Sequence, residues 1–123
     1  MAGGYPMILV IVESPYAGDV EGNLEYLRAC LRDCLKRGEA PFASHGLYTQ
    51  PGVLRDEIPD ERELGILAGF HWRPAAQKTV VYTDRGFSNG MRQGIAHAEA
   101  IGQAVEYRTL APHDTLRPGD PAP

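Results

Sequence analysis

The sequence predicts an α/β fold: a doubly wound, mostly parallel sheet with helices on both faces. Short apolar or β-branched runs alternate with segments of helical periodicity in the order β-α-β-loop-α-β-α-β. The first run, 7–12, is continuously apolar, as a central strand covered on both faces should be. We therefore expect this strand in the middle of the sheet, between the second and third strands. The strand order would then reverse between the first and the third strand.

The first helix is predicted from about residue 22 or 23 to residue 37, because leucines and cysteines recur there at helical spacing. Asn23 is the expected N-cap, and Gly38 suits the position just beyond the last turn. Cys30 and Cys34 lie four residues apart, so they share one face of this helix. Because they form no CxxC motif, we interpret them as reduced core residues, which favours a cytoplasmic protein.

A short second strand is predicted over 40–44, and Pro41 confines it to a sheet edge or a strand start. The stretch from residue 45 to about residue 59 shows no regular periodicity. Loops of this length in compact domains are often binding loops. A lone histidine is more often structural, but here it is followed by other hydrogen-bonding and stacking groups. The candidate ligand contacts of this loop are His45, Tyr48, Thr49 and Gln50.

The second half of the chain completes the alternation of helices and strands. A helix is predicted over 59–71, with a proline and acidic residues in its first turn. The run 79–82 is predicted as the third strand and, like the first, as a buried one. A further helix follows Ser88 and ends before Gly102, and the alternating segment 104–108 is the last strand.

Length and composition are those of one soluble globular domain. The chain has 123 residues, of which 43% are hydrophobic and 23% charged, and we expect one domain over 1–110 and a flexible, Pro-rich tail over 111–123. The net charge of -4 gives no support to binding of polymeric nucleic acid. The longest apolar run is too short to span a membrane, and the first residues lack the basic region of a signal peptide. No Cys/His cluster indicates a metal site, and we expect no cofactor.

Polar groups follow the strand at 79–82, where an open α/β sheet places its ligand crevice. Asp84 could hold sugar hydroxyls, while the free N–H groups of the helix after Ser88 could hold an anion. The segment also contains Gly86, Gly90 and Met91 as candidate contacts. Asp84 and Ser88 could equally be no more than a turn residue and a helix cap.

The loop after the first strand is the other candidate contact region. It contains neither a GxGxxG pattern nor a Walker A pattern, so it is not a phosphate-binding fingerprint. Tyr16 could cover a sugar or base, and Gly18 permits close approach of the backbone, although glycine and proline could simply turn the chain here. The candidate residues of this region are Glu13, Ser14, Tyr16, Gly18 and Asp19.

Taken together, these motifs resemble the nucleoside 2-deoxyribosyltransferase-like superfamily. The resemblance covers about residues 7–108 and is carried by Ser14-Pro15-Tyr16 and by the pattern Asp84-x-Gly86-x-Ser88-x-Gly90-Met91. That group includes deoxynucleoside 5′-monophosphate N-glycosidases and small phage and bacterial proteins. It implies a flavodoxin-like fold of four to five strands and a nucleoside or nucleotide ligand. It also implies a homo-oligomer in which a neighbouring chain often completes the site.

The resemblance further implies residue roles. Tyr16 would lie over the sugar or base, and Asp84 would hold sugar hydroxyls or assist protonation of the base. Ser88 and Gly90 would meet a 5′-phosphate. The family's nucleophile is a glutamate six residues after this serine, and that position in this chain is Gly94.

Gly94 therefore removes the carboxylate that an oxocarbenium-like sugar requires on its anomeric carbon. Another acid would have to replace it, with His45 as general acid for the leaving base. The candidate replacements are Asp84, Glu13, Glu61 and Asp19.

Two functions follow from these residues. The favoured one is an enzyme that cleaves or transfers at the N-glycosidic bond of a (deoxy)nucleoside or its 5′-monophosphate, with hydrolysis better supported than transfer. The alternative is a non-catalytic binder of a nucleotide or a nucleotide-derived signal. We favour the enzyme because the expected crevice contains more reactive and hydrogen-bonding groups than simple binding requires, namely Asp84, His45, Tyr16 and Tyr48. A flavin-binding protein is less well supported, since fold alone does not imply function.

Overall fold

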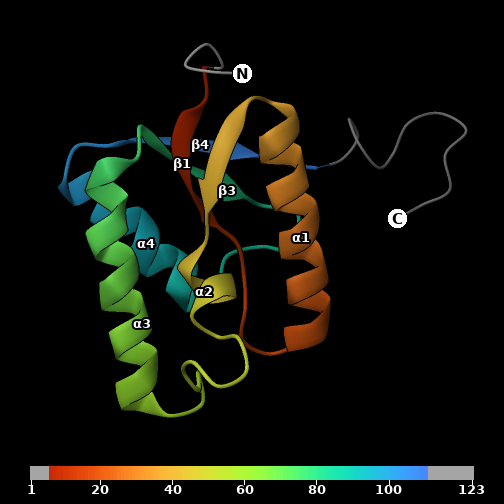
Figure 1. Cartoon of the computed structure of the whole chain (residues 1–123), viewed down its shortest axis with the longest axis vertical. Helices are drawn as coiled ribbons and strands as arrows, with labels where there is room; N and C mark the ends of the chain where they lie inside the picture. Colours follow the sequence, from red (N-terminus) through yellow and green to blue (C-terminus); the bar gives the residue numbers. More distant parts are fainter. Residues whose placement is uncertain (1–5, 111–123) are drawn as a thin grey trace, which may run out of the picture.

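The fold is that of a computed structural model, which describes residues 6–110 (Figure 1). In chain order the elements are β1 (Ile8–Glu13), α1 (Val20–Lys36), β2 (Glu39–Phe42), α2 (Ser44–Leu47), α3 (Pro59–Trp72), a short 3₁₀ helix η1 (Arg73–Ala75), β3 (Lys78–Tyr82), α4 (Asn89–Ala100) and β4 (Ala104–Arg108). Within residues 6–110, no helix is both long enough and apolar enough to cross a membrane. The expectations for the first residues and for the 111–123 tail lie outside the described residues.

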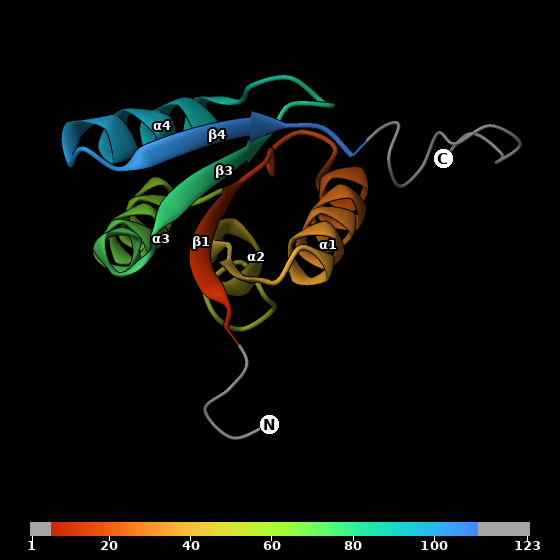
Figure 2. The same cartoon turned by 90° about the horizontal axis from the view of Figure 1, so that it is seen from above.

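The sheet is entirely parallel, with strand order β2-β1-β3-β4. The order therefore reverses between β1 and β3, as the sequence predicts, and β2 with its Pro41 lies at an edge. Figure 2 shows α1 on one face of the sheet and α3 and α4 on the other. The predicted α/β class is confirmed, and the arrangement is consistent with a flavodoxin-like fold.

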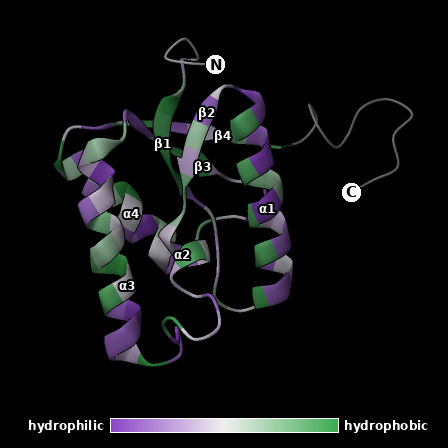
Figure 3. Cartoon of the chain, viewed as in Figure 1, coloured by the Kyte–Doolittle hydropathy of each residue, from purple (hydrophilic) through white to green (hydrophobic). Residues whose placement is uncertain are grey.

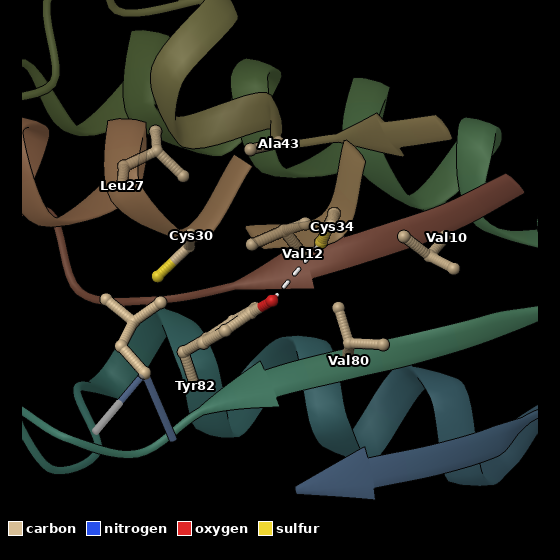
Figure 4. Packing of buried hydrophobic residues seen from close by; sticks show 9 residues of the cluster. Val10, Val12, Leu27, Cys30, Cys34, Ala43, Val80 and Tyr82 are labelled. Atoms are coloured by element: carbon tan, nitrogen blue, oxygen red, sulfur yellow. Dashed lines mark hydrogen bonds between the residues drawn. The ribbon is translucent and has the colours of Figure 1, made fainter. Parts of the chain in front are cut away.

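Alternate residues of the central strands face the two helical layers. The side facing α1 is an apolar cluster in which the Cys34 sulfur lies 3.4 Å from the Tyr82 hydroxyl oxygen (Figure 4). Both cysteines are free and fully buried, as predicted. In Figure 3 the two central strands are hydrophobic, whereas α1 alternates between hydrophobic and hydrophilic residues. The cluster includes Val10, Val12, Leu27, Cys30, Cys34, Val80 and Tyr82.

The start of α1 differs from the prediction. Asp19, not Asn23, is the N-cap, and its Oδ1 accepts a hydrogen bond from the Gly22 N–H at 3.2 Å. Asn23 is buried one turn later, where its side-chain amide donates to the carbonyl oxygens of Tyr16 and Ala17 at 3.0 and 3.1 Å. The helix therefore begins earlier than expected, and Asn23 fixes the loop after β1 instead.

The segment after β2 also differs from the prediction. The strand ends at Phe42, which pairs with Ile11, and Ala43 is the N-cap of the short helix α2. The predicted loop therefore starts with a helical turn. The side chain of Thr49 donates to the His45 carbonyl oxygen at 2.6 Å, and that of Gln50 donates to the Gly46 carbonyl oxygen at 2.8 Å. These two bonds hold the carboxyl end of α2, which positions His45.

Candidate functional site

A cavity of about 450 Å³ opens at the carboxyl edge of the sheet, where the strand order reverses. Its walls come from the end of β1 and the following loop, the start of α2, the inner face of α3 and the start of α4. Apolar surface is supplied by Ile11, Phe42, Ile66 and Phe70. The polar residues of the wall are Glu13, Ser14, Tyr16, Ser44, His45, Asp56, Arg62, Arg73, Ser88 and Asn89.

Glu13 is the last residue of β1 and is buried in the cavity wall, with 8% of its surface exposed. Its Oε2 accepts a hydrogen bond from Nη2 of Arg73 at 2.7 Å. Burial outweighs the effect of this cation and raises the pKa of Glu13 to about 7. A Cβ atom on Gly94 would overlap the Glu13 carboxyl group. The glycine of α4 therefore leaves room for the carboxylate of β1.

Ser14 and His45 form a second polar pair in the wall. The Ser14 Oγ lies 2.7 Å from Nε2 of His45. Burial lowers the pKa of His45 to about 4, so its imidazole is neutral at physiological pH. His45 can therefore exchange hydrogen bonds with Ser14 and a ligand, but it holds no extra proton to donate as an imidazolium. The general-acid role predicted for His45 therefore has no support from an imidazolium at physiological pH.

The start of α4 brings free backbone N–H groups to the cavity. Ser88 is the N-cap, as predicted, and its Oγ accepts a hydrogen bond from the Met91 N–H at 3.2 Å. The Arg62 side chain of α3 approaches the same turn, because one of its nitrogens would lie 4.0 Å from a Cβ on Gly90. Arg62 also pairs loosely with Asp56 at 3.7 Å. Among the described residues, no group of three His, Cys, Asp or Glu side chains is arranged to hold a metal ion.

Comparison with known proteins places this architecture in a family. A family model described as a domain of unknown function, DUF7768, matches residues 8–108, from the start of β1 to the end of β4. The chain belongs to the DUF7768 family. No curated protein and no solved structure matches the chain. The matched range contains every residue that lines the cavity.

Seven of the sequence-predicted site residues line the main cavity of this DUF7768 domain: Glu13, Ser14, Tyr16, His45, Ser88, Gly90 and Met91. Asp84 does not. Its Oδ2 accepts hydrogen bonds from the Tyr26 hydroxyl at 2.6 Å and from the Leu110 N–H at 3.0 Å. The expectation that Asp84 faces the crevice together with Ser88 therefore differs from the structure, in which Asp84 joins β3 to α1. Its ligand role stays a prediction without support from this geometry.

Three further predicted contacts have local structural roles in the DUF7768 domain. Gly18 and Gly86 have φ angles of 95° and 80°, which glycine adopts without strain, so both are turn residues. Asp19 caps α1 and pairs with Arg85 at 3.2 Å. None of the three lines the main cavity. They shape the loops on either side of it.

Tyr48 and Gln50 lie near the site but outside the main cavity. Tyr48 lines a smaller adjoining cavity of about 50 Å³ that also includes His45, and its hydroxyl accepts a hydrogen bond from Nε1 of Trp72 at 2.8 Å. Gln50 lines an apolar groove between α1 and α2 instead. Direct ligand contact by these two residues also stays a prediction.

Sequence reasoning missed the two arginines of the site, Arg62 and Arg73. The sequence places Arg62 only inside the helix predicted over 59–71, and Arg73 in the link between that helix and the strand predicted over 79–82. A signal was present, because Arg62, Ile66, Phe70 and Arg73 recur at helical spacing and all line the cavity. Arg73 ends this stripe beside the buried Glu13 carboxylate, and Arg62 begins it near Asp56.

Proposed function

We propose that the cavity binds a nucleoside or its 5′-monophosphate and that Glu13 acts on the N-glycosidic bond. The position of the Glu13 carboxyl group carries this proposal. It fills the volume that a side chain at position 94 would take, and position 94 is where the resembling superfamily has its nucleophilic glutamate. A carboxylate from β1 would thus replace one from α4, in nearly the same place.

The favoured reaction is hydrolysis. The bond between the anomeric carbon and the base nitrogen breaks, and its electron pair leaves with the base. The ionised Glu13 carboxylate stabilises the positive charge on the sugar, either as an ion pair or by forming a glycosyl ester. Water then adds its hydroxyl group to the anomeric carbon, which releases Glu13, and its proton is taken up by the base. The products are the free base and the sugar or sugar phosphate.

The alternative, a non-catalytic binder, is favoured by a different observation. The Glu13 carboxylate already accepts a 2.7 Å hydrogen bond from Arg73, and this pair could serve only to shape the pocket. A binder would retain the ligand without releasing base. The expected homo-oligomer and the cytoplasmic location also stay predictions.

Incubation with a panel of nucleosides and 5′-monophosphates, followed by chromatography of free base, tests the proposal directly. We expect base release that increases as the pH rises through about 7, because only the ionised form of Glu13 is active. Glu13→Gln should reduce the rate by about 100-fold or more.

Asp84→Asn is the matched control, because it removes a carboxylate that does not line the cavity. It should leave the rate nearly unchanged. Loss of activity in Asp84→Asn together with retention in Glu13→Gln would overturn the proposal, because the reaction would then depend on Asp84 and not on Glu13. Tight binding with no base release from any compound would support the binder.

A second prediction concerns phosphate recognition. The α4 N-terminus and Arg62 should together make a 5′-monophosphate bind more tightly than its nucleoside, by roughly 1.5–3 kcal/mol. Calorimetry on the Glu13→Gln protein measures both affinities without turnover. Arg62→Ala should remove most of the difference. Arg92→Ala is the control, because Arg92 is an exposed cation of α4 that lies over Phe87. Equal affinities for nucleoside and monophosphate would remove the phosphate role from this turn.

A further inference from the structure

Arg73 is a buried cation, and each part of its guanidinium group is bonded to a different partner. Only 3% of its surface is exposed. Its Nη2 donates to Glu13 at 2.7 Å, and its Nη1 donates to Oγ1 of Thr79 at 2.6 Å. Its Nε donates to Nδ1 of His97 at 3.0 Å. The bond to Glu13 therefore depends on an orientation that the other two bonds define.

His97 is the partner that reaches this cation from α4. Its ring stacks on Phe70 of α3, with the ring centres 4.0 Å apart and the planes 4° from parallel. The stack fixes the plane of the imidazole and directs Nδ1 at Arg73. Because Nδ1 accepts the Arg73 hydrogen bond, the ring proton must be on Nε2. Protonation of His97 would replace this acceptor with a donor and place a second cation beside Arg73.

The backbone of Arg73 is held independently of its side chain. The Gln103 amide donates to the carbonyl oxygen of Arg73 at 2.8 Å and to that of Ala76 at 3.0 Å. Loss of the His97 acceptor would therefore leave the Arg73 backbone in place and free mainly its guanidinium group.

We propose that His97 is a positioning residue, which orients Arg73 so that the arginine donates to the Glu13 carboxylate and favours its ionised form in the cavity. This inference rests on the proposed function, because it names the device that regulates the same carboxylate. His97 does not line the cavity, and its side chain is hydrogen-bonded to Arg73. The ionisable groups bonded to Arg73 are Glu13 and His97, and His71 of α3 is a further ionisable group near His97. Across the cavity, His45 is bonded to Ser14.

Two substitutions of His97 separate the acceptor from the ring. His97→Phe keeps an aromatic ring for the stack on Phe70 but removes the acceptor. His97→Asn removes the ring but places an amide oxygen close to the position of Nδ1. The readout is the titration of Glu13 in the full chain, followed by carbon NMR of labelled glutamate carboxyl groups and assigned with Glu13→Gln. No substrate is required.

We expect His97→Phe to raise the Glu13 midpoint by about one pH unit, because the bond from Arg73 loosens. His97→Asn should titrate close to the wild type. An unchanged midpoint in His97→Phe would overturn the proposal. So would an equal increase in both variants, because the effect would then come from loss of the ring.

A measurement on the wild-type protein covers the case in which His97→Phe does not fold. The Arg73 Nε–H resonance should shift with the same pH midpoint as the His97 ring, because protonation removes the acceptor. An Arg73 Nε–H resonance whose chemical shift stays constant while His97 titrates would overturn the proposal. Absence of base release with the panel of nucleosides would refute the proposed enzyme function while leaving both titration results intact. The two failures are therefore distinguishable.

Discussion

Gly94→Ala is expected to destabilise the protein, although alanine at a glycine of a helix interior normally stabilises by up to about 1 kcal/mol. The added Cβ would overlap the Glu13 carboxyl group, which is confined between α4 and Arg73. Glu13 must then turn away, and the buried Arg73 loses its carboxylate. We expect a loss of about 1–3 kcal/mol in the free energy of unfolding, measured by urea denaturation. Any base release should fall about 100-fold, because the carboxylate leaves its position.

Gly90→Ala is the matched control in the same helix. The nearest atom to a Cβ on Gly90 would be 3.9 Å away, so this alanine meets no conflict. It should be neutral or slightly stabilising. If Gly94→Ala behaved in the same way, the Glu13 carboxylate would not be confined where the structure has it.

A double-substitution cycle makes the test more specific. Once Glu13→Ala has removed the carboxyl group, Gly94→Ala should become neutral or stabilising, and this change of sign measures the contact between the two positions. Glu13→Ala/Gly94→Glu moves the carboxylate from the strand to the helix. If the two positions serve one volume, the exchange should restore part of the base release that Glu13→Ala removes.

Much of the fold could be predicted because the deciding signals are local. A continuously apolar run is sufficient to place β1 in the centre, and Pro41 is sufficient to place β2 at an edge. The prediction of Asn23 as the N-cap of α1 was wrong because Asp19 and Asn23 are both good capping residues and lie one turn apart. Propensity does not distinguish them. The structure does, because the Asn23 amide is used to hold the preceding loop.

The site was only partly predictable because it depends on which way side chains face. Strand-end rules bring Glu13, Ser14 and Ser88 to the crevice, and they do lie together. The same rule was misleading for Asp84. Tyr82 faces α1, and Asp84, two residues further on, stays on that side and bonds to Tyr26. Arg73 was missed because its partner Glu13 lies sixty residues away in the sequence.

The other large effect is expected on the opposite face of the sheet, at Arg108. This residue ends β4, and its guanidinium group donates to both carboxylate oxygens of Glu39 at 2.9 Å. Glu39 begins β2, so the pair joins the two edge strands. Both residues are buried, and Arg108 also donates to the Tyr82 hydroxyl at 3.2 Å. Arg108→Met would leave the Glu39 carboxylate buried without its main partner.

We expect Arg108→Met to reduce the free energy of unfolding by about 3–5 kcal/mol, the usual cost of removing one member of a buried ion pair. The pH dependence supplies a second signature. Burial alone would raise the pKa of Glu39, but Arg108 and Lys78 outweigh it and hold that pKa below its usual value. The stabilisation from an acid with a lowered pKa is present above its unfolded value and is lost as the pH falls through the folded one. The difference between wild type and variant should therefore shrink below about pH 4.5.

Lys78→Met is the matched control for Arg108→Met. Lys78 also contacts Glu39, at 3.4 Å, but its side chain is partly exposed and it bonds to Glu106 as well. Removing it should cost less than about 1 kcal/mol. Equal losses in the two variants would show that general positive charge, rather than the two-pronged contact of Arg108, stabilises the buried Glu39. A loss in Arg108→Met that persists unchanged at acid pH would instead locate the effect in side-chain packing, because a protonated Glu39 no longer needs a cation.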